Sequence, residues 1–358
     1  MLRARTAVQD LPEYHPPLAG RDGLRLDFNE NTEGCSPRVL QQLRKITADD
    51  LARYPERGPV EAVVAAHLGL VAEQVLLTNG VDEAIHLLCE TYLEPLDEVL
   101  VVTPTFGMYE IYAGATGARV VRVQCAADFR FPLAKVLDGI HPATRLIAVA
   151  SPNNPTGTVA DREQLLQIAR AAPDAALLVD EAYFEFHGET VVCDIDSFDN
   201  LFVTRTFSKA YGLAGLRIGI LAGPRPQMPR VRRVSSPYSV NAVALAVLPA
   251  ALADSDHISC YVAQVKNGRQ RVQGALAALG LHSWPSQANF LLVRIGEKHH
   301  EFVSAMRQRA VLVRDRSSDP GCAGCVRITI GSEVQTTQLI AALGEVVREL
   351  ELGREVTA

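Results

Sequence analysis

One lysine stands between hydroxyl-bearing residues and a glycine-rich segment. Lys209 ends the stretch Thr204-Arg205-Thr206-Phe207-Ser208-Lys209, and Gly212-Leu213-Ala214-Gly215-Leu216-Arg217 follows it. We expect Lys209 to follow a buried strand, where burial lowers the pKa of an amine and favours its attack on a carbonyl carbon. Side chains of the types that surround a phosphate lie close by along the chain: Thr206, Ser208 and Arg217. This segment predicts covalent amine chemistry beside a bound phosphate.

A carboxylate ends another apolar run. Asp180 follows Leu177-Leu178-Val179 and precedes Glu181-Ala182-Tyr183. An unpaired carboxylate is costly at the end of a buried strand, so Asp180 needs a cationic partner. A protonated ring nitrogen of a cofactor would serve, and so would a nearby arginine in a purely structural ion pair.

Three further junctions carry polar or aromatic residues. The turn at residues 78–83 precedes an expected helix, Glu83–Glu90, and predicts either an anion site at Val81 and Asp82 or a tight turn with Asp82 as helix N-cap. Phe106 could stack on a flat cofactor or pack in the core. Ser151-Pro152-Asn153-Asn154-Pro155-Thr156-Gly157 is a rigid turn that directs Asn154, although most such clusters are only turns.

Short apolar runs alternate with helical patterns from about residue 74 to 222, which predicts an α/β domain with a mostly parallel sheet. In such sheets ligands bind outside the carboxyl ends of the strands. The last run need not be parallel. The expected strands are Val75–Thr78, Glu98–Val102, Arg119–Val123, Arg145–Ala150, Ala176–Asp180, Leu201–Thr204 and Arg217–Leu221.

The texture changes after Pro249 to an α+β lobe. Its expected elements are a helix at Ile258–Leu279, strands at Asn289–Arg294 and Val326–Ile330, and a helix at Glu333–Leu350. The first 30 residues or so are proline-rich and loop-like, and we expect them to lie across the body or a neighbouring subunit. The chain is therefore predicted to comprise an arm (1–29), a large domain (30–249) and a small domain (250–358).

Composition narrows the function. A net charge of -6 argues against nucleic acid, which needs a basic face. We find no signal peptide and no apolar run of membrane-spanning length, and seven scattered cysteines suit a reducing cytoplasm. Cys322 and Cys325 have CxxC spacing, but His299 and His300 are too loosely placed to complete a zinc site with them. We expect incidental loop cysteines and no metal.

Taken together, SPNNPTG, DEAYFEF and RTFSKAYGLAGLRIG resemble segments of the fold-type I, class I/II aminotransferases, which use pyridoxal 5′-phosphate (PLP). The likeness is strongest to the histidinol-phosphate aminotransferase subfamily. It runs from Leu26-Asp27-Phe28-Asn29-Glu30-Asn31 to Arg327-Ile328-Thr329-Ile330-Gly331, nearly the whole chain. It implies a large three-layer α/β/α domain with a smaller α+β lobe.

The resemblance also implies roles. Lys209 would bind PLP covalently and move the proton during transfer, while Asp180 would pair with the ring nitrogen. Asn154 and Tyr183 would contact the 3′-oxygen, and Phe106 would stack on the ring. The phosphate would be held by the backbone at Val81 and Asp82 together with Thr206, Ser208 and Arg217. Tyr54 would reach the partner subunit's cofactor, which implies a homodimer with shared active sites.

Arg314, Arg327 and Tyr14, with Asn154, would bind the substrate, because an arginine fork suits phosphate or carboxylate. The implied reaction is ping-pong transfer between L-histidinol phosphate and 2-oxoglutarate, giving imidazole-acetol phosphate and L-glutamate, in histidine biosynthesis. We interpret Arg309 and Arg316 as surface salt-bridge residues. Asn31-Thr32-Glu33-Gly34-Cys35-Ser36-Pro37 departs from the family pattern, so the entrance wall differs.

Other functions stay open at this point. They are an aromatic amino acid aminotransferase, a threonine-phosphate decarboxylase-like enzyme and a non-catalytic PLP-binding protein. A nicotinamide oxidoreductase lacks its glycine fingerprint here, and a PLP-binding transcriptional regulator lacks room for a DNA-binding domain before Leu26.

Overall fold

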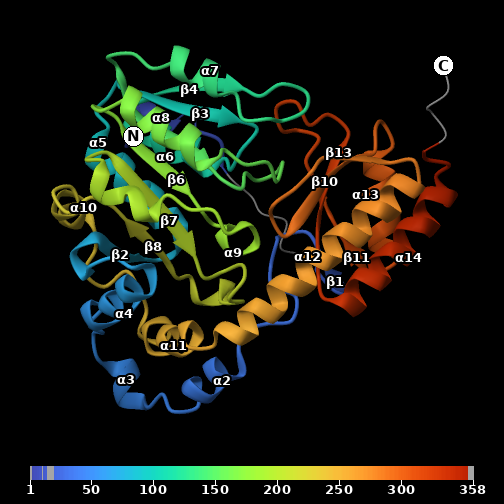
Figure 1. Ribbon diagram of the computed structural model, residues 1–358, viewed down its shortest axis with the longest axis horizontal. Helices are drawn as coiled ribbons and strands as arrows, with labels where there is room; N and C mark the ends of the chain where they lie inside the picture. Colours follow the sequence, from blue (N-terminus) through green and yellow to red (C-terminus); the bar gives the residue numbers. More distant parts are fainter. Residues whose placement is uncertain (1, 10, 14–19, 354–358) are drawn as a thin grey trace.

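The computed structural model describes residues 2–9, 11–13 and 20–353. Its main feature is a seven-stranded sheet in the order β2-β8-β7-β6-β5-β3-β4, flanked by helices on both faces (Figure 1). All pairings are parallel except those of β8, which runs antiparallel to both β7 and β2. The strands are β2 Val75–Thr78, β3 Glu98–Thr103, β4 Arg119–Gln124, β5 Thr144–Ala150, β6 Ala176–Asp180, β7 Leu201–Thr206 and β8 Gly219–Ala222.

The central strands are buried on both faces because successive side chains enter two different cores. In β6, Leu177 and Val179 join one hydrophobic cluster and Leu178 joins the other. This explains why these strands read as continuous apolar runs rather than as alternating ones. Helices α5 Gly80–Tyr92, α6 Met108–Thr116 and α10 Met228–Val234 cover one face, and α8 Arg162–Ala171 packs on the other.

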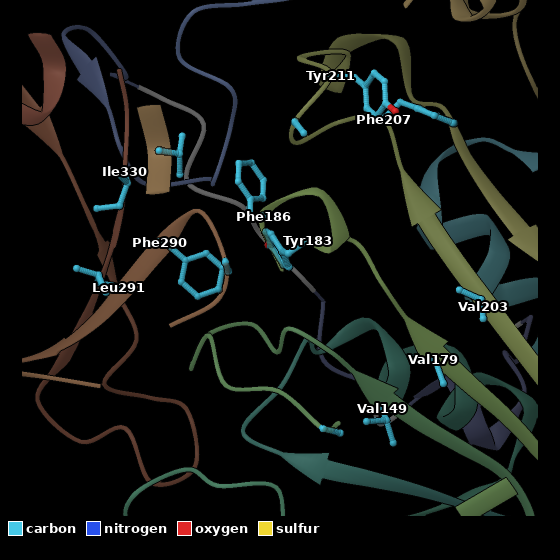
Figure 2. Packing of buried hydrophobic residues seen from close by; sticks show 14 of the residues in the cluster. Val149, Val179, Tyr183, Phe186, Val203, Phe207, Tyr211, Phe290, Leu291 and Ile330 are labelled. Atoms are coloured by element: carbon cyan, nitrogen blue, oxygen red, sulfur yellow. The ribbon is translucent and has the colours of Figure 1, made fainter. Parts of the chain in front are cut away.

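A smaller four-stranded sheet, β12-β13-β10-β9, is antiparallel throughout. Its strands are β9 His282–Ser283, β10 Phe290–Arg294, β12 Arg314–Asp315 and β13 Cys325–Thr329, and helices α12 Ser255–Ala278, α13 His299–Gln308 and α14 Glu333–Glu349 accompany it. One hydrophobic cluster runs from the large sheet to the small one. Figure 2 shows Val179 and Val203 on the large sheet and Phe290 and Ile330 on the other side of Tyr183 and Phe186.

The remaining elements connect these sheets. Strand β1 pairs in parallel with β11, so the N-terminal segment is attached to the smaller lobe. The remaining elements are α1 Thr6–Gln9, β1 Leu24–Arg25, α2 Pro37–Leu43, α3 Ala48–Ala52, α4 Gly58–Leu68, α7 Leu133–Asp138, α9 Phe184–His187, α11 Ala242–Leu252 and β11 Val311–Leu312, with 3-10 turns η1 Ala72–Gln74, η2 Val192–Ser197 and η3 Ala214–Leu216.

The α/β architecture and each expected strand are confirmed, and no strand end is shifted by more than two residues. The helix expected at Glu83–Glu90 begins earlier, at Gly80, and that correction matters for the site. Tyr14 lies outside the described residues. The division of the chain at residues 29 and 249 remains a prediction.

Cys322 lies in a loop as expected, but Cys325 is the first residue of β13 and not a loop residue. Both side chains are fully buried and pack in a small cluster with Trp284 and Leu292. In the described part of the chain, no single helix is long and apolar enough to cross a membrane. The pair α11 and α12 meets length and composition limits only together, bent by 80°.

Asn200 offers a test of how the loop after α8 is fixed. Its buried amide donates to the carbonyl oxygens of Ala169, Ala172 and Ala175, at 3.1, 2.7 and 3.1 Å. We expect Asn200→Ala to destabilise the fold by about 1–3 kcal/mol, because three buried acceptors lose their donor. Urea unfolding followed by circular dichroism measures this. The exposed neighbouring change Asp199→Ala is the control, and equal midpoints for the two variants would contradict the assignment.

Candidate active site

A cavity of ≈ 250 Å³ lies outside the carboxyl ends of the large sheet's central strands. Of the residues predicted to bind a cofactor, all but Tyr54 lie in its wall. They are Val81, Asp82, Phe106, Asn154, Asp180, Tyr183, Thr206, Ser208, Lys209 and Arg217. The strand-end positions that looked chemically unusual in sequence therefore converge on one space.

Asp180 is buried and has two hydrogen-bond donors. The Tyr109 hydroxyl donates to Oδ2 at 2.5 Å and the Ala182 amide donates to Oδ1 at 2.9 Å. Burial raises the pKa of Asp180 to about 6, while the two hydrogen bonds oppose that rise. Among the described residues, neither lysine nor arginine forms an ion pair with Asp180, so the alternative of a structural ion pair with a nearby arginine is wrong.

Tyr109 was missed by the sequence analysis. It lies three residues after Phe106, one helical turn away, and the two rings meet edge to face at 5.8 Å between centroids. That spacing was the available signal. Burial raises the pKa of the Tyr109 hydroxyl well above its ordinary range, with the Asp180 charge adding to the effect, so the hydroxyl remains a donor.

The strand ends behind Asp180 are held by a buried ion pair. Glu181 is 1% exposed and accepts from Arg205 Nε at 2.9 Å, from the Val191 amide at 2.9 Å and from Thr190 Oγ1 at 2.8 Å. Arg205 also stacks over the Phe184 ring at 3.5 Å. With every partner satisfied, this network fixes β6 and β7, whose next residues form the cavity.

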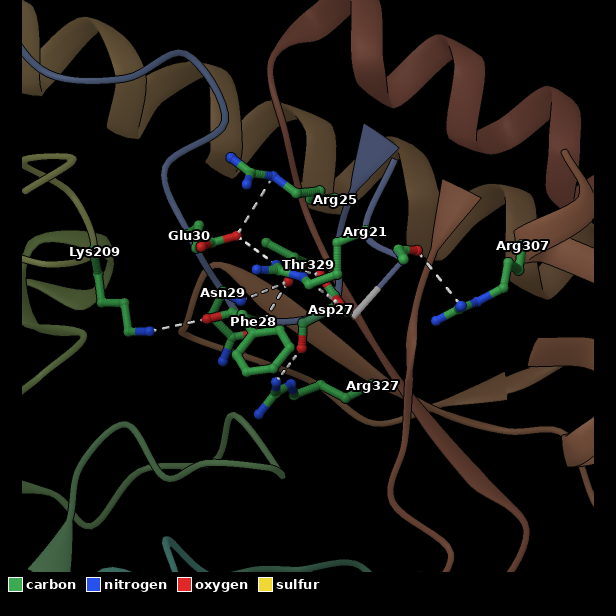
Figure 3. A network of polar contacts seen from close by, with 11 residues as sticks. Arg21, Arg25, Asp27, Phe28, Asn29, Glu30, Lys209, Arg307, Arg327 and Thr329 are labelled. Carbon is green, nitrogen blue, oxygen red and sulfur yellow. Dashed lines mark hydrogen bonds and ion pairs between the residues drawn. The ribbon is translucent and has the colours of Figure 1, made fainter. Parts of the chain in front are cut away.

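Lys209 points across the cavity to the N-terminal segment, where its Nζ donates to the Phe28 carbonyl at 3.0 Å (Figure 3). Burial, together with the positive charge of Arg327, lowers the pKa of Lys209 to about 8. A larger share of this amine is thus neutral near physiological pH than in an exposed lysine.

The opposite wall is the N-terminus of α5. Gly80 has φ +74°, a conformation that favours glycine, and a side-chain Cβ there would stand 2.6 Å from Arg217 Nη2 and displace that guanidinium. Arg217, itself left-handed with φ 53°, pairs with Asp82 at 3.0 Å. Asp82 lies within the first helical turn and is not the N-cap, which is Asn79. The backbone N–H groups at this helix start and the Arg217 guanidinium could hold an anion.

A second cavity of ≈ 560 Å³ shares Phe28, Phe106, Asn154, Tyr183 and Lys209 with the first, so the two form one cleft. Arg314, Arg316 and Arg327 lie in its wall. Arg314 on β12 is the direct cross-strand partner of Arg327 on β13. Arg327 donates to Asn154 Oδ1 at 2.5 Å and to the Asp27 carbonyl at 2.6 Å, and burial lowers its pKa to about 10.

Asn29 is a second residue that the sequence analysis did not single out. It is 1% exposed and adopts φ 56°. Its side chain donates to the Tyr183 hydroxyl at 2.9 Å and accepts from Thr329 Oγ1 at 3.0 Å, while its backbone carbonyl accepts from Asn289 at 3.1 Å. Asn29 thus links Tyr183, after the large sheet, to Thr329 on the small one, and Figure 3 shows its contact with Thr329. Its only sequence signal was its place in the Leu26–Asn31 match.

The outcome differs among the other predicted residues. Arg309 forms the expected surface ion pairs, with Glu345 at 2.9 Å and Glu349 at 2.6 Å. Arg316 is not a surface residue: it pairs with Asp319, and its side chain is only 16% exposed. His299 and His300 face Asp315 instead of the cysteine pair. Tyr54 is 78% exposed and is absent from the described walls of both cavities.

Comparisons with known proteins agree with this geometry. Residues 21–343 match the family model described as aminotransferase class I and II. The chain is similar to the histidinol-phosphate aminotransferase of Dehalococcoides mccartyi, with 34% identity over 95% of this chain and 97% of the relative. It is 36% identical to that of a Jannaschia species, over 97% and 98% of the two chains.

Among solved structures, the histidinol-phosphate aminotransferase of Sinorhizobium meliloti in complex with pyridoxal-5′-phosphate is similar at 26% identity. Its TM-score is 0.88, and the match covers 98% of this chain and 99% of that one. Both the family model and the full-length relatives span the cleft described above. The chain belongs to the class I and II aminotransferases.

Proposed function

We propose that this aminotransferase binds PLP in the cavity at Lys209 and transfers the amino group between L-histidinol phosphate and 2-oxoglutarate. The observation that carries the proposal is the cross-strand pair Arg314–Arg327 at one part of a cleft whose other part holds Lys209. The names of the relatives support the phosphorylated substrate over the alternatives, an aromatic amino acid or decarboxylation of threonine phosphate.

The donor set of the cavity fits the cofactor. An aldehyde requires a neutral amine, and Lys209 has a pKa lowered to about 8 by burial. A protonated ring nitrogen requires a buried carboxylate without a cation of its own, and Asp180 answers that description. A phosphate requires backbone N–H groups and a cation, which the start of α5 and Arg217 provide.

When bound, PLP supplies an electron sink for the carbon that bears the amino group. Lys209 holds and returns the proton at that carbon. Asp180, as a carboxylate, would pair with the ring nitrogen, and Phe106 and Ala182 would contact the ring. Tyr183 and Asn154 would donate to its 3′-oxygen. The phosphate would be held by Val81, Asp82, Thr206, Ser208 and Arg217.

Arg314 and Arg327 orient the anionic end of each substrate in turn, phosphate in one half-reaction and carboxylate in the other. Tyr14 is proposed to bind the substrate together with these arginines. Access of water to the cleft is limited by Phe28 and Phe106, which lie in the walls of both cavities.

The proposal includes a cytoplasmic homodimer. Tyr54 stacks on Tyr238 at 4.4 Å between centroids, and both rings are exposed. Leu40 and Leu51 nearby in sequence are exposed as well. An exposed aromatic pair beside apolar side chains suits an interface, and from it Tyr54 would serve the partner's cofactor.

The pKa of Lys209 gives a pH prediction for covalent capture of PLP by the cofactor-free protein. The ammonium form cannot attack the aldehyde, so capture should accelerate with pH and level off above about 8, not near the ordinary lysine value of 10.5. Stopped-flow absorbance at a series of pH values measures the rate.

Arg327→Gln removes a positive charge that opposes the ammonium, so the midpoint of this profile should move to higher pH. Lys209→Ala is the control and should give no covalent band at any pH. A rate that climbs steadily through pH 10 would sink the assignment of a buried, activated amine.

Tyr109→Phe tests the support of Asp180. The tyrosine hydroxyl favours the ionised carboxylate, so its removal should raise the pKa of Asp180. Activity depends on the carboxylate and falls as pH drops through that pKa, so the acidic limb of kcat/KM should shift to higher pH. Tyr112→Phe on the same helix, where the ring stacks on His86, should leave the limb in place.

The substrate is decided by adding L-histidinol phosphate, L-phenylalanine and L-glutamate separately to the PLP-loaded protein. Each productive donor bleaches the cofactor band. We expect L-histidinol phosphate to act at far lower concentration than L-phenylalanine, because two guanidiniums bind a phosphate more strongly than a carboxylate. The reverse order would make this an aromatic amino acid aminotransferase.

A further inference from the structure

Arg316 lies where a third cation would reach a ligand held by Arg314 and Arg327. Its backbone N–H donates to the Cys325 carbonyl at 2.9 Å, which continues the pairing of β12 with β13 by one residue. Alternate residues of an extended strand face the same side, so Arg316 follows Arg314 on that face. All three arginines lie in the wall of the larger cavity.

Two of these guanidiniums have a buried donor without a partner. Within the described chain, Nε of Arg316 and Nε of Arg327 are buried and make no hydrogen bond. Arg327 is 5% exposed, so water does not solvate it freely. Buried N–H donors are usually satisfied, and leaving one unpaired beside a charge is costly. Both observations indicate an acceptor-rich ligand between these side chains.

Charge balance specifies the ligand further. Other acidic side chains in the wall have separate partners: Asp27 with Arg21, Glu110 with Arg122 and Asp315 with His299. Of the described acidic residues in the wall, Asp319 is the one that pairs with one of these three arginines, Arg316. Three guanidiniums and one carboxylate leave two net positive charges. A phosphate monoester carries about -1.5 to -2 near neutral pH, whereas a carboxylate carries one negative charge.

We propose that Arg316 is a third anion-binding residue of the substrate site, and that with its counter-ion Asp319 it adapts the cleft to a phosphate dianion rather than a carboxylate. This rests on the proposed function and deepens it, because it names the residue that separates the phosphorylated donor from L-glutamate. Asp319 compensates the Arg316 charge when the site holds no substrate. Arg316 serves binding and is not part of the proton transfer at Lys209.

The test compares wild type with Arg316→Gln in the PLP-loaded enzyme. We expect KM for L-histidinol phosphate to rise about ten- to a hundredfold, the loss of one charge-assisted hydrogen bond. The loss in kcat/KM should be much smaller for L-histidinol, which has the same ring and amine without the phosphate. Arg316→Lys keeps the charge but not the fork of the guanidinium. Its KM for L-histidinol phosphate should lie between the values for wild type and for Arg316→Gln.

Arg309→Gln is the matched control, an arginine of the same lobe whose ion pairs lie outside the cleft. It should leave both substrates unaffected. An equal loss on L-histidinol and L-histidinol phosphate in Arg316→Gln would show a merely structural role and overturn the proposal. The absorbance band of the loaded variant confirms that its fold and cofactor site persist.

Competitive inhibition by inorganic phosphate distinguishes the proposed role of Arg316 from the proposed function. It is measured against whichever donor bleaches the cofactor band. If L-histidinol phosphate does not bleach the cofactor band of the wild-type enzyme, the proposed function is wrong. Arg316 still stands as an anion-binding residue if Arg316→Gln weakens phosphate inhibition. Unchanged phosphate inhibition in that variant overturns the inference, whatever the natural substrate is.

Discussion

Two arginines placed directly opposite each other on adjacent strands set the requirements for the rest of the cleft. Arg314 and Arg327 carry like charges at a cross-strand position, which is unfavourable unless other groups compensate. The compensation comes from Asn154 Oδ1, the Asp27 carbonyl and the rings of Phe28 and Phe290, which lie about 5.3 and 5.4 Å from the guanidinium carbons of Arg314 and Arg327. The positive charge of Arg327 also helps to lower the pKa of Lys209. Arg327 thus connects substrate recognition to the reactivity of the amine.

This arrangement depends on the N-terminal segment lying between the two sheets. Asp27 and Phe28 offer backbone carbonyls to Arg327 and Lys209, so the segment accepts hydrogen bonds from the binding side and the reactive side together. Asn29 anchors it through Thr329 and Tyr183. Because these contacts join residues that are 154 to 300 positions apart, the cleft exists only when both lobes and the segment are folded together.

The sequence was sufficient where a local pattern and the chemistry of one residue agreed. Asp180 ends a continuous apolar run and Lys209 lies shortly after another expected strand, so their positions near strand ends could be read directly. Tyr109 and Asn29 could not be assigned in this way, because their roles come from contacts with distant residues. Arg316 was misread because β12 is only two residues long and gives no periodic signal. The helix start at Gly80 was placed late because a glycine usually indicates a turn.

Burial, more than ion pairing, prepares the reactive groups. Desolvation disfavours charge of either sign, and it moves Lys209 down to about 8 and Asp180 up to about 6. Both pKa values are therefore closer to neutral than the ordinary values: more of Lys209 is a neutral amine near pH 7, where proton transfer is effective, while most of Asp180 is still ionised. The hydroxyl of Tyr109 limits the rise at Asp180, and without it this carboxylate would be neutral more often. The anion-binding end follows the opposite rule, because its guanidiniums stay charged and are balanced by Asp319 and by the substrate.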